Sequence, residues 1–134
     1  MKYIVLSLLS LFVVATASAQ KIDNKKGITY IDETPVLKLV DGSLVFDNKP
    51  VKVSSNESGK LLFVITRHFY EKGGKTGLWY YEVRFADFDL AFRNAQDYKV
   101  IIKNLLETGA LNKKGELSED GIKKYIKLYS EDVP

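Results

Sequence analysis

The feature that most constrains the fold is a pair of long strand-forming segments in the middle of the chain, at residues 61–70 and 78–85. Both are rich in β-branched and aromatic residues, and the glycine-containing sequence EKGGKTG joins them. They therefore predict a long antiparallel hairpin. Its odd-numbered positions are mostly apolar and should face a core, with Arg67 as the exception, whereas its even-numbered positions are more polar and should face water or a partner.

Shorter strand signals precede this hairpin at residues 28–31, 36–40, 43–46 and 51–53. Turn sequences separate them, such as Asp41-Gly42, in which glycine reaches positive φ without steric cost. Because consecutive strands with short connections tend to pair with their neighbours, the expected sheet is an antiparallel meander of about 5–6 strands.

Two amphipathic helices are predicted after the hairpin. Asn94 is expected to cap the first helix, with Asp97 three residues later as in a capping box, and Gly109 to end it. Ser118 is expected to cap the second helix. Residues 86–92 fit either a strand or a helical turn, and the sequence leaves both open. Strands followed by helices predict an α+β fold, with two C-terminal helices packed on one face of the sheet.

The N-terminus has the pattern of a signal peptide. Lys2 supplies a positive charge, an almost wholly apolar run covers residues 3–14, and Ala17-Ser18-Ala19 matches the small-x-small sequence that precedes a cleavage site. The alternative, a membrane anchor, would need about 20 apolar residues. We therefore expect cleavage after Ala19, and no cysteine follows the apolar run to accept a lipid.

Cleavage would leave a soluble chain that is periplasmic or secreted and has no membrane span. Residues 20–27 are polar and are expected to form a flexible lead-in, and residues 28–134 a single globular domain. Without the leader the chain would have 19 basic and 17 acidic residues, a net charge of +2, because Lys2 is the leader's only charged residue. Such a small charge gives no general argument for nucleic-acid binding.

Composition excludes several kinds of chemistry. The chain has no cysteine, and its single histidine is His68. Disulfides, a thiolate nucleophile and a zinc site built from Cys and His are therefore excluded, and any catalytic triad that needs histidine must use His68.

Two motifs resemble ligand-binding loops but lack the required residues. Gly74-Lys75-Thr76 matches the end of a phosphate-binding loop, yet Phe69 stands where the first glycine belongs and a strand, not a helix, follows. The region around Asn112–Ser118 has the spacing of a calcium-binding loop, yet Ala110, Lys114 and Gly121 occupy its first, fifth and twelfth ligand positions. No cofactor and no metal site is expected.

The candidate binding site is the even-numbered face of the hairpin. If Tyr70 and Leu78 flank the loop directly, the register places His68 opposite Tyr80. The predicted patch then consists of His68, Tyr70, Tyr80, Glu82 and Arg84. A carboxylate beside an imidazole can fix its tautomer, but no serine lies in a nucleophile-elbow context. An ordinary solvated strand face is the other interpretation, and aromatic, acidic and basic side chains together favour recognition over catalysis.

A second arrangement of carboxylates is also considered. Asp87 and Asp89 lie close together in sequence, and either could pair with Glu82 across a glycosidic bond, although an acidic pair between two elements is more often part of a cap or turn. Together these patterns favour a non-enzymatic protein-binding module of the bacterial cell envelope, such as an inhibitor or an immunity-type protein, whose partner docks on the 61–85 hairpin. The alternative is a small envelope hydrolase or ligand binder acting on glycan or peptide. The sequence leaves the partner and the oligomeric state open.

Overall fold

The computed structural model describes residues 20–41 and 49–133. Within these residues the chain forms seven strands followed by two helices. In chain order they are β1 (Ile22–Lys25), β2 (Ile28–Ile31), β3 (Thr34–Val40), β4 (Val51–Ser55), β5 (Leu61–Lys72), β6 (Lys75–Phe85), β7 (Ala91–Asn94), α2 (Tyr98–Glu107) and α3 (Glu119–Tyr129).

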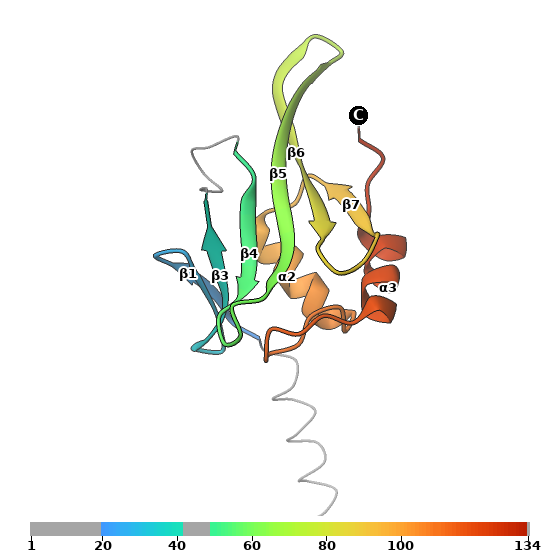
Figure 1. The fold of residues 1–134 in the computed structure, drawn as a ribbon. Coiled ribbons are helices and arrows are strands. Elements are labelled where there is room, and N and C mark those ends of the chain that lie inside the picture. The colour runs from blue at the N-terminus through green and yellow to red at the C-terminus, as the bar shows by residue number, and fades with distance from the viewer. Residues whose placement is uncertain (1–19, 42–48, 134) are drawn as a thin grey trace, which may run out of the picture.

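The strands form one curled antiparallel sheet in which each strand pairs with its neighbours in sequence, from β1 to β7 (Figure 1). The two helices pack on one face of this sheet and complete the core. The predicted α+β fold with two C-terminal helices is therefore confirmed, and the sheet has more strands than the 5–6 expected. The strand expected at residues 43–46 lies outside the described residues.

The additional strands lie at the two edges of the sheet. Residues 22–25, which the sequence analysis assigned to a flexible lead-in, form β1, where Ile22 pairs with Ile31 and Lys25 with Ile28. The sheet thus begins earlier than the predicted domain boundary. β1 has the sequence IDNK, which lacks the alternation of apolar and polar residues that predicts a strand. An edge strand can form with so few apolar residues because one side of it faces solvent.

The segment that fitted both strand and helix forms a turn and then a strand. β6 ends at Phe85, and β7 pairs with it from Ala91 onwards. Phe92 of β7 is buried between Phe85 and Tyr125, with ring centroids 6.0 and 4.5 Å away. The alternation of apolar residues was therefore the informative pattern here, and the helical spacing was incidental.

The prediction for the start of the first helix is wrong. Asn94 is the last residue of β7 and is fully buried, and Asp97 occupies the N-cap position of α2. The Asn94 side chain donates a hydrogen bond to the Tyr125 hydroxyl, at 2.9 Å. Ser118 caps α3 as predicted, since its hydroxyl accepts a hydrogen bond from the Gly121 amide.

The central hairpin is longer than predicted. Lys72 pairs with Lys75, so Gly73 and Gly74 alone make the turn. Their φ angles are +58° and +78°, as in a type I′ turn, which matches the twist of the strands and needs positive φ at both central positions. The sequence EKGGKTG is thus mostly strand, and the hairpin projects beyond the other strands (Figure 1).

The core lies between the odd-numbered face of the hairpin and the two helices. Its hairpin members Phe63, Ile65, Tyr81, Val83 and Phe85 are buried as predicted, against Ile101, Leu105, Ile122 and Tyr125 of the helices. Phe69 is different, because 52% of its surface is exposed. It lies on the projecting part of the hairpin, so the expectation that it joins the core is wrong. Among the described residues, neither helix has the length and apolar character that crossing a bilayer requires.

Candidate functional site

The hairpin register follows the prediction. Tyr70 pairs with Leu78, His68 with Tyr80 and Thr66 with Glu82. β4 pairs with β5 only as far as Ile65, and β7 pairs with β6 only from Tyr81 onwards. Residues 66–80 therefore lie beyond both neighbouring strands, and we call them the hairpin arm.

Three of the predicted site residues form a chain of hydrogen bonds at the base of this arm. The Glu82 carboxylate contacts His68 Nε2 at 2.9 Å with one oxygen, and its other oxygen accepts a hydrogen bond from Arg84 at 2.8 Å. Only 13% of the Glu82 side chain is exposed, whereas Arg84 is largely exposed. Glu82 is therefore held between two partners, and Arg84 offers its outer surface to solvent.

Aromatic side chains complete the patch. The His68 ring stacks on Tyr80, with centroids 5.1 Å apart, and Tyr70 packs against the same ring at 5.8 Å. The Arg93 guanidinium lies 5.9 Å from the Tyr80 ring centroid. Tyr80 is consequently buried although it is on the outer face of the sheet. The structure thus brings all five predicted residues together and adds Arg93, which the sequence analysis missed because β7 was not assigned.

The electrostatics of the patch keep Glu82 ionised. Desolvation alone would raise the pKa of its carboxyl, but the hydrogen bond with His68 and the positive charges of Arg84 and Arg93 outweigh that effect, so the pKa lies below the ordinary value of 4.5. A carboxylate with a lowered pKa is a poor general acid at neutral pH. Its chemistry fits the organisation of neighbouring cations better than proton donation.

A shallow hollow of about 260 Å³ adjoins the patch. Glu82, Arg84 and Arg93 line one side, and Ser130 and Glu131 line the other. The segment after α3 is fixed there because the Glu131 amide donates a hydrogen bond to the Arg93 carbonyl, at 2.7 Å. The outer face of the sheet therefore has a hollow next to Glu82 and Arg84.

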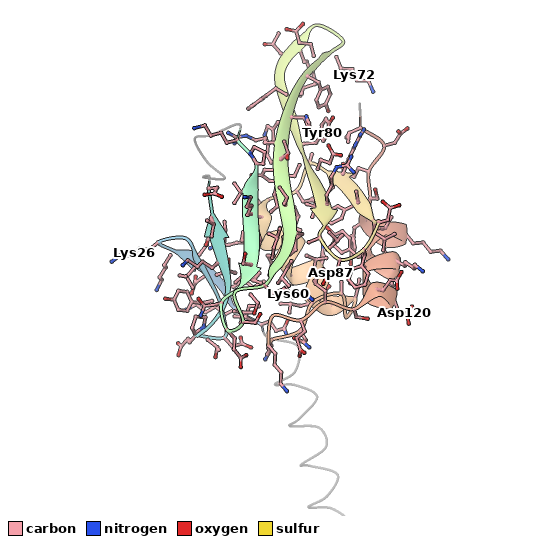
Figure 2. All side chains as sticks on the ribbon, in the orientation of Figure 1. Lys26, Lys60, Lys72, Tyr80, Asp87 and Asp120 are labelled. Atoms are coloured by element: carbon pink, nitrogen blue, oxygen red, sulfur yellow. The ribbon has the colours of Figure 1, made fainter. Side chains whose placement is uncertain are left out.

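The carboxylate pairing that the sequence left open as an alternative is not supported by the cavities. Asp87 makes an ion pair with Lys60 and lines a different cavity from Glu82, and Asp89 is exposed. Figure 2 shows Lys60 and Asp87 at one end of the sheet and Lys72 at the end of the hairpin arm. A glycosidase-like pair of Glu82 with Asp87 is therefore not supported by the geometry.

The connection between α2 and α3 is a tight turn built around Asn112. Its side-chain oxygen accepts hydrogen bonds from the Lys114 and Glu116 amides, both at 3.0 Å, and its amide group donates to the Glu116 carboxylate. The Asn112 side chain is thus used inside the loop. Across the part of the chain that the structure describes, no group of three or more acidic or histidine side chains is placed to hold a metal ion.

The other face of the hairpin arm is also aromatic. The Arg67 guanidinium lies over the Phe69 ring at 5.1 Å, and Trp79 packs edge-on against Tyr81 at 5.0 Å. Burial raises the pKa of Tyr81, which the Arg67 charge opposes. A cavity of about 400 Å³ lies at this place, between the arm, β1 and the start of α2. The arm therefore carries aromatic and basic side chains on both faces.

Comparison of the sequence and fold with protein-family models, curated proteins and solved structures gives no match. The class that the structure defines is an α+β protein with a seven-stranded antiparallel sheet, two C-terminal helices and a projecting hairpin arm.

Proposed function

We propose that the chain is a non-enzymatic protein-binding module of the bacterial cell envelope, of the inhibitor or immunity type, and that it inserts the hairpin arm into a cleft on its partner. The observation that carries the proposal is the arm itself. Residues 66–80 lie beyond β4 on one side and β7 on the other, so the arm has two strand edges without a neighbouring strand among the described residues. Projecting ribbons of this kind suit insertion into a cleft or pairing with an extended segment.

The side chains of the arm support the proposal. Phe69 is the most exposed large apolar residue of the sheet, and Tyr70 and Trp79 are half-buried. Aromatic residues and arginine are the groups that contribute most to protein interfaces. Trp79 packs against the edge of the core, but about half of Phe69 remains exposed among the described residues and is available to a partner.

Charge indicates what kind of partner the arm fits. The arm contains three basic residues, Arg67, Lys72 and Lys75, and one acidic residue, Glu71. At the base of the arm, Glu82 is already paired with Arg84 and His68, and Arg93 adds a further positive charge. The partner should therefore present an acidic cleft, and its affinity for this chain should fall as salt rises.

The signal-peptide pattern at residues 1–19 supports an envelope partner. Secretion through this peptide, which is part of the proposal, would deliver the domain to the periplasm or the exterior, where the partner would be found. The hydrolase alternative is less well supported, because Glu82 and Asp87 line different cavities.

The experiment uses site-specific photo-crosslinking. A photoreactive phenylalanine analogue replaces Phe69 in the exported protein, and a control protein carries it at Leu128 on α3, where the side chain is similarly exposed at 58%. Cells are irradiated and the crosslinked species are isolated. We expect a defined adduct from position 69 and none of the same mass from position 128.

The purified partner is then titrated against Phe69→Ala, Arg84→Ala and the matched control Leu128→Ala. Loss of one interface anchor should weaken binding by roughly tenfold or more, and the control should bind like the wild type. All three positions are exposed, so the melting temperatures of Phe69→Ala and Leu128→Ala should stay close to that of the wild type. Arg84→Ala also removes a partner of Glu82, which should destabilise by at most about 1 kcal/mol because the pair is exposed on the Arg84 side. Absence of an adduct at position 69, or equal binding by Phe69→Ala and the wild type, would refute docking through the arm.

A further inference from the structure

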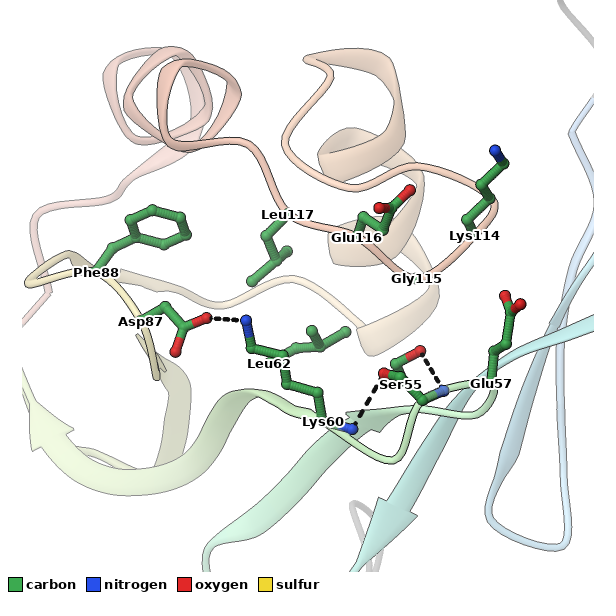
Figure 3. Close-up of a pocket in the computed structure, with 11 residues that line it drawn as sticks. Ser55, Glu57, Lys60, Leu62, Asp87, Phe88, Lys114, Gly115, Glu116 and Leu117 are labelled. Atoms are coloured by element: carbon green, nitrogen blue, oxygen red, sulfur yellow. Dashed lines mark hydrogen bonds and ion pairs between the residues drawn. The ribbon is translucent and has the colours of Figure 1, made fainter.

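A further cavity lies away from the hairpin arm and has no role in the proposed docking. It has a volume of about 530 Å³, within the range of pockets that hold small ligands. Three loops surround it: β4–β5, β6–β7 and α2–α3 (Figure 3). It is therefore a separate site, at the end of the sheet that carries Lys60 and Asp87.

The cavity has an apolar floor. Leu62, Phe88 and Leu117 contribute aliphatic and aromatic surface from β5, the β6–β7 loop and the α2–α3 loop. In Figure 3 their side chains lie on the same side of the cavity as the Asp87 carboxylate. An apolar group of a ligand placed there would be removed from water, which is favourable in proportion to the area covered.

The rim of the cavity carries charges of both signs. Lys60 and Asp87 form an ion pair beside the floor, and Glu57, Lys114 and Glu116 extend the rim. The Lys60 and Asp87 side chains are 61% and 49% exposed. An ion pair this exposed contributes at most about 1 kcal/mol, so a ligand that supplies replacement charges can separate it at little cost.

The walls of the cavity are pre-formed. Gly115 is buried with a φ of +76°, and a Cβ at this position would lie 2.8 Å from Ser55 Oγ and 3.2 Å from the Val36 carbonyl oxygen. The α2–α3 loop therefore packs directly on the end of β4. The hydrogen bonds that Asn112 accepts from Lys114 and Glu116 hold the loop in that position. A ligand would not have to order the α2–α3 loop, which lowers the entropic cost of binding.

We propose that this cavity binds a short peptide with free termini and apolar side chains. The ammonium group of the peptide pairs with Asp87, its carboxylate pairs with Lys60, and an apolar side chain covers Leu62, Phe88 and Leu117. Binding of such a zwitterion would separate Lys60 from Asp87 and replace their ion pair with two ion pairs to the ligand. A simple anion would leave Asp87 without a counter-charge and a simple cation would leave Lys60 without one, whereas the zwitterion satisfies both.

The test is a titration followed by amide chemical shifts of the isotope-labelled protein, with the dipeptide leucyl-leucine as the probe. We expect saturable shifts confined to the three loops around the cavity, with the amides of Ser58, Lys60 and Leu117 among those that move. N-acetyl-leucyl-leucine amide lacks both charges, and glycyl-glycine lacks the apolar side chains. Each should bind at least about tenfold more weakly than leucyl-leucine, because each loses one of the two components.

Variants connect the binding to the proposed residues. Lys60→Met and Asp87→Asn should each weaken leucyl-leucine binding by roughly tenfold or more. The matched control is Lys123→Met on α3, which removes a similarly exposed lysine from an ion pair with Glu119 and should leave the affinity unchanged. The proposal is overturned if leucyl-leucine gives no saturable shifts at these loops, if the uncharged analogue or glycyl-glycine binds equally well, or if Lys60→Met and Asp87→Asn bind leucyl-leucine as tightly as the wild type and Lys123→Met do.

Discussion

Replacement of Gly121 by alanine gives a test in which the structure and helix propensity predict opposite signs. Gly121 lies in the first turn of α3, after the cap Ser118. In an exposed helix, a change from glycine to alanine stabilises by about 1 kcal/mol, because alanine loses less backbone entropy on folding. Propensity alone therefore predicts a more stable protein.

The packing of α3 reverses this expectation. A Cβ built on Gly121 lies 2.4 Å from the Ala110 nitrogen, 2.4 Å from the Gly109 carbonyl carbon and 2.5 Å from the Gly109 oxygen. All three contacts are backbone atoms, so no side-chain rotation can relieve them. α3 would have to move by about 1 Å to reach ordinary van der Waals distance, which begins near 3.4 Å.

The size of the effect follows from two opposing contributions. Overpacking of a tight contact costs about 1–3 kcal/mol, and the rigid backbone here places the cost at the upper end of that range. Subtracting about 1 kcal/mol for propensity leaves a net destabilisation of about 1–2 kcal/mol. For a chain of this size, that lowers the melting temperature by roughly 4–12 °C.

The assay is urea unfolding together with thermal unfolding, and the control is a pair of variants at Lys124, an exposed position of the same helix. Lys124→Ala should be more stable than Lys124→Gly by about 1 kcal/mol, which calibrates propensity within α3. At position 121 the order should reverse, with glycine more stable than alanine. If Gly121→Ala is as stable as the wild type or more stable, close packing of α3 on residues 109–110 does not limit the side chain at position 121, and the reasoning is refuted.

Three further predictions concern hydrogen bonds. Burial raises the pKa of Tyr125 to about 12, so its contribution to stability is complete below pH 10 and falls by about 1.4 kcal/mol per pH unit between pH 10 and 12. Tyr125→Phe should therefore flatten this part of a curve of unfolding free energy against pH. At pH 7 the same variant should cost about 1–2 kcal/mol, because the Asn94 amide loses its partner. Ser118→Ala should destabilise by about 0.5–1 kcal/mol in urea unfolding, through loss of the α3 cap. Glu82 has a lowered pKa, so it stabilises the fold above pH 4.5 and this contribution is lost as pH falls through the lowered value; Glu82→Gln should reduce acid destabilisation in that window.

The sequence predicted most reliably those parts of the fold in which one local pattern determined the structure. The alternation along the hairpin predicted its core face, the placement of Tyr70 opposite Leu78 predicted its register, and the apolar stripe and the serine cap predicted α3. Asn94 shows the limit, because its spacing from Asp97 imitates a capping box while its amide is needed by Tyr125, 31 residues away. A contact between residues so far apart in sequence cannot be predicted from the spacing of neighbouring residues. β1 was missed for a similar reason, since its strand character comes from pairing with β2.

The candidate site was predictable to the extent that it follows from register. His68, Tyr80 and Glu82 meet because they occupy facing or diagonal positions on one face of a hairpin, which a period of two already implies. Arg93 comes from β7, and the 530 Å³ cavity comes from three loops that are far apart in sequence. Neither of these could be found without the tertiary structure, because their residues share no spacing that a strand or helix imposes.

The structure also divides the predicted patch into two parts with different physical roles. Tyr80 and Glu82 are largely buried under neighbouring side chains, so they are suited to stiffening the base of the arm. A two-stranded ribbon is only marginally stable in water, and a ribbon fixed at its base loses less conformational entropy when it binds. Arg84 and Phe69 are exposed and remain available for contact. Substitution of Tyr80 or Glu82 should therefore loosen the arm and lower the melting temperature, whereas loss of Phe69 should weaken partner binding alone.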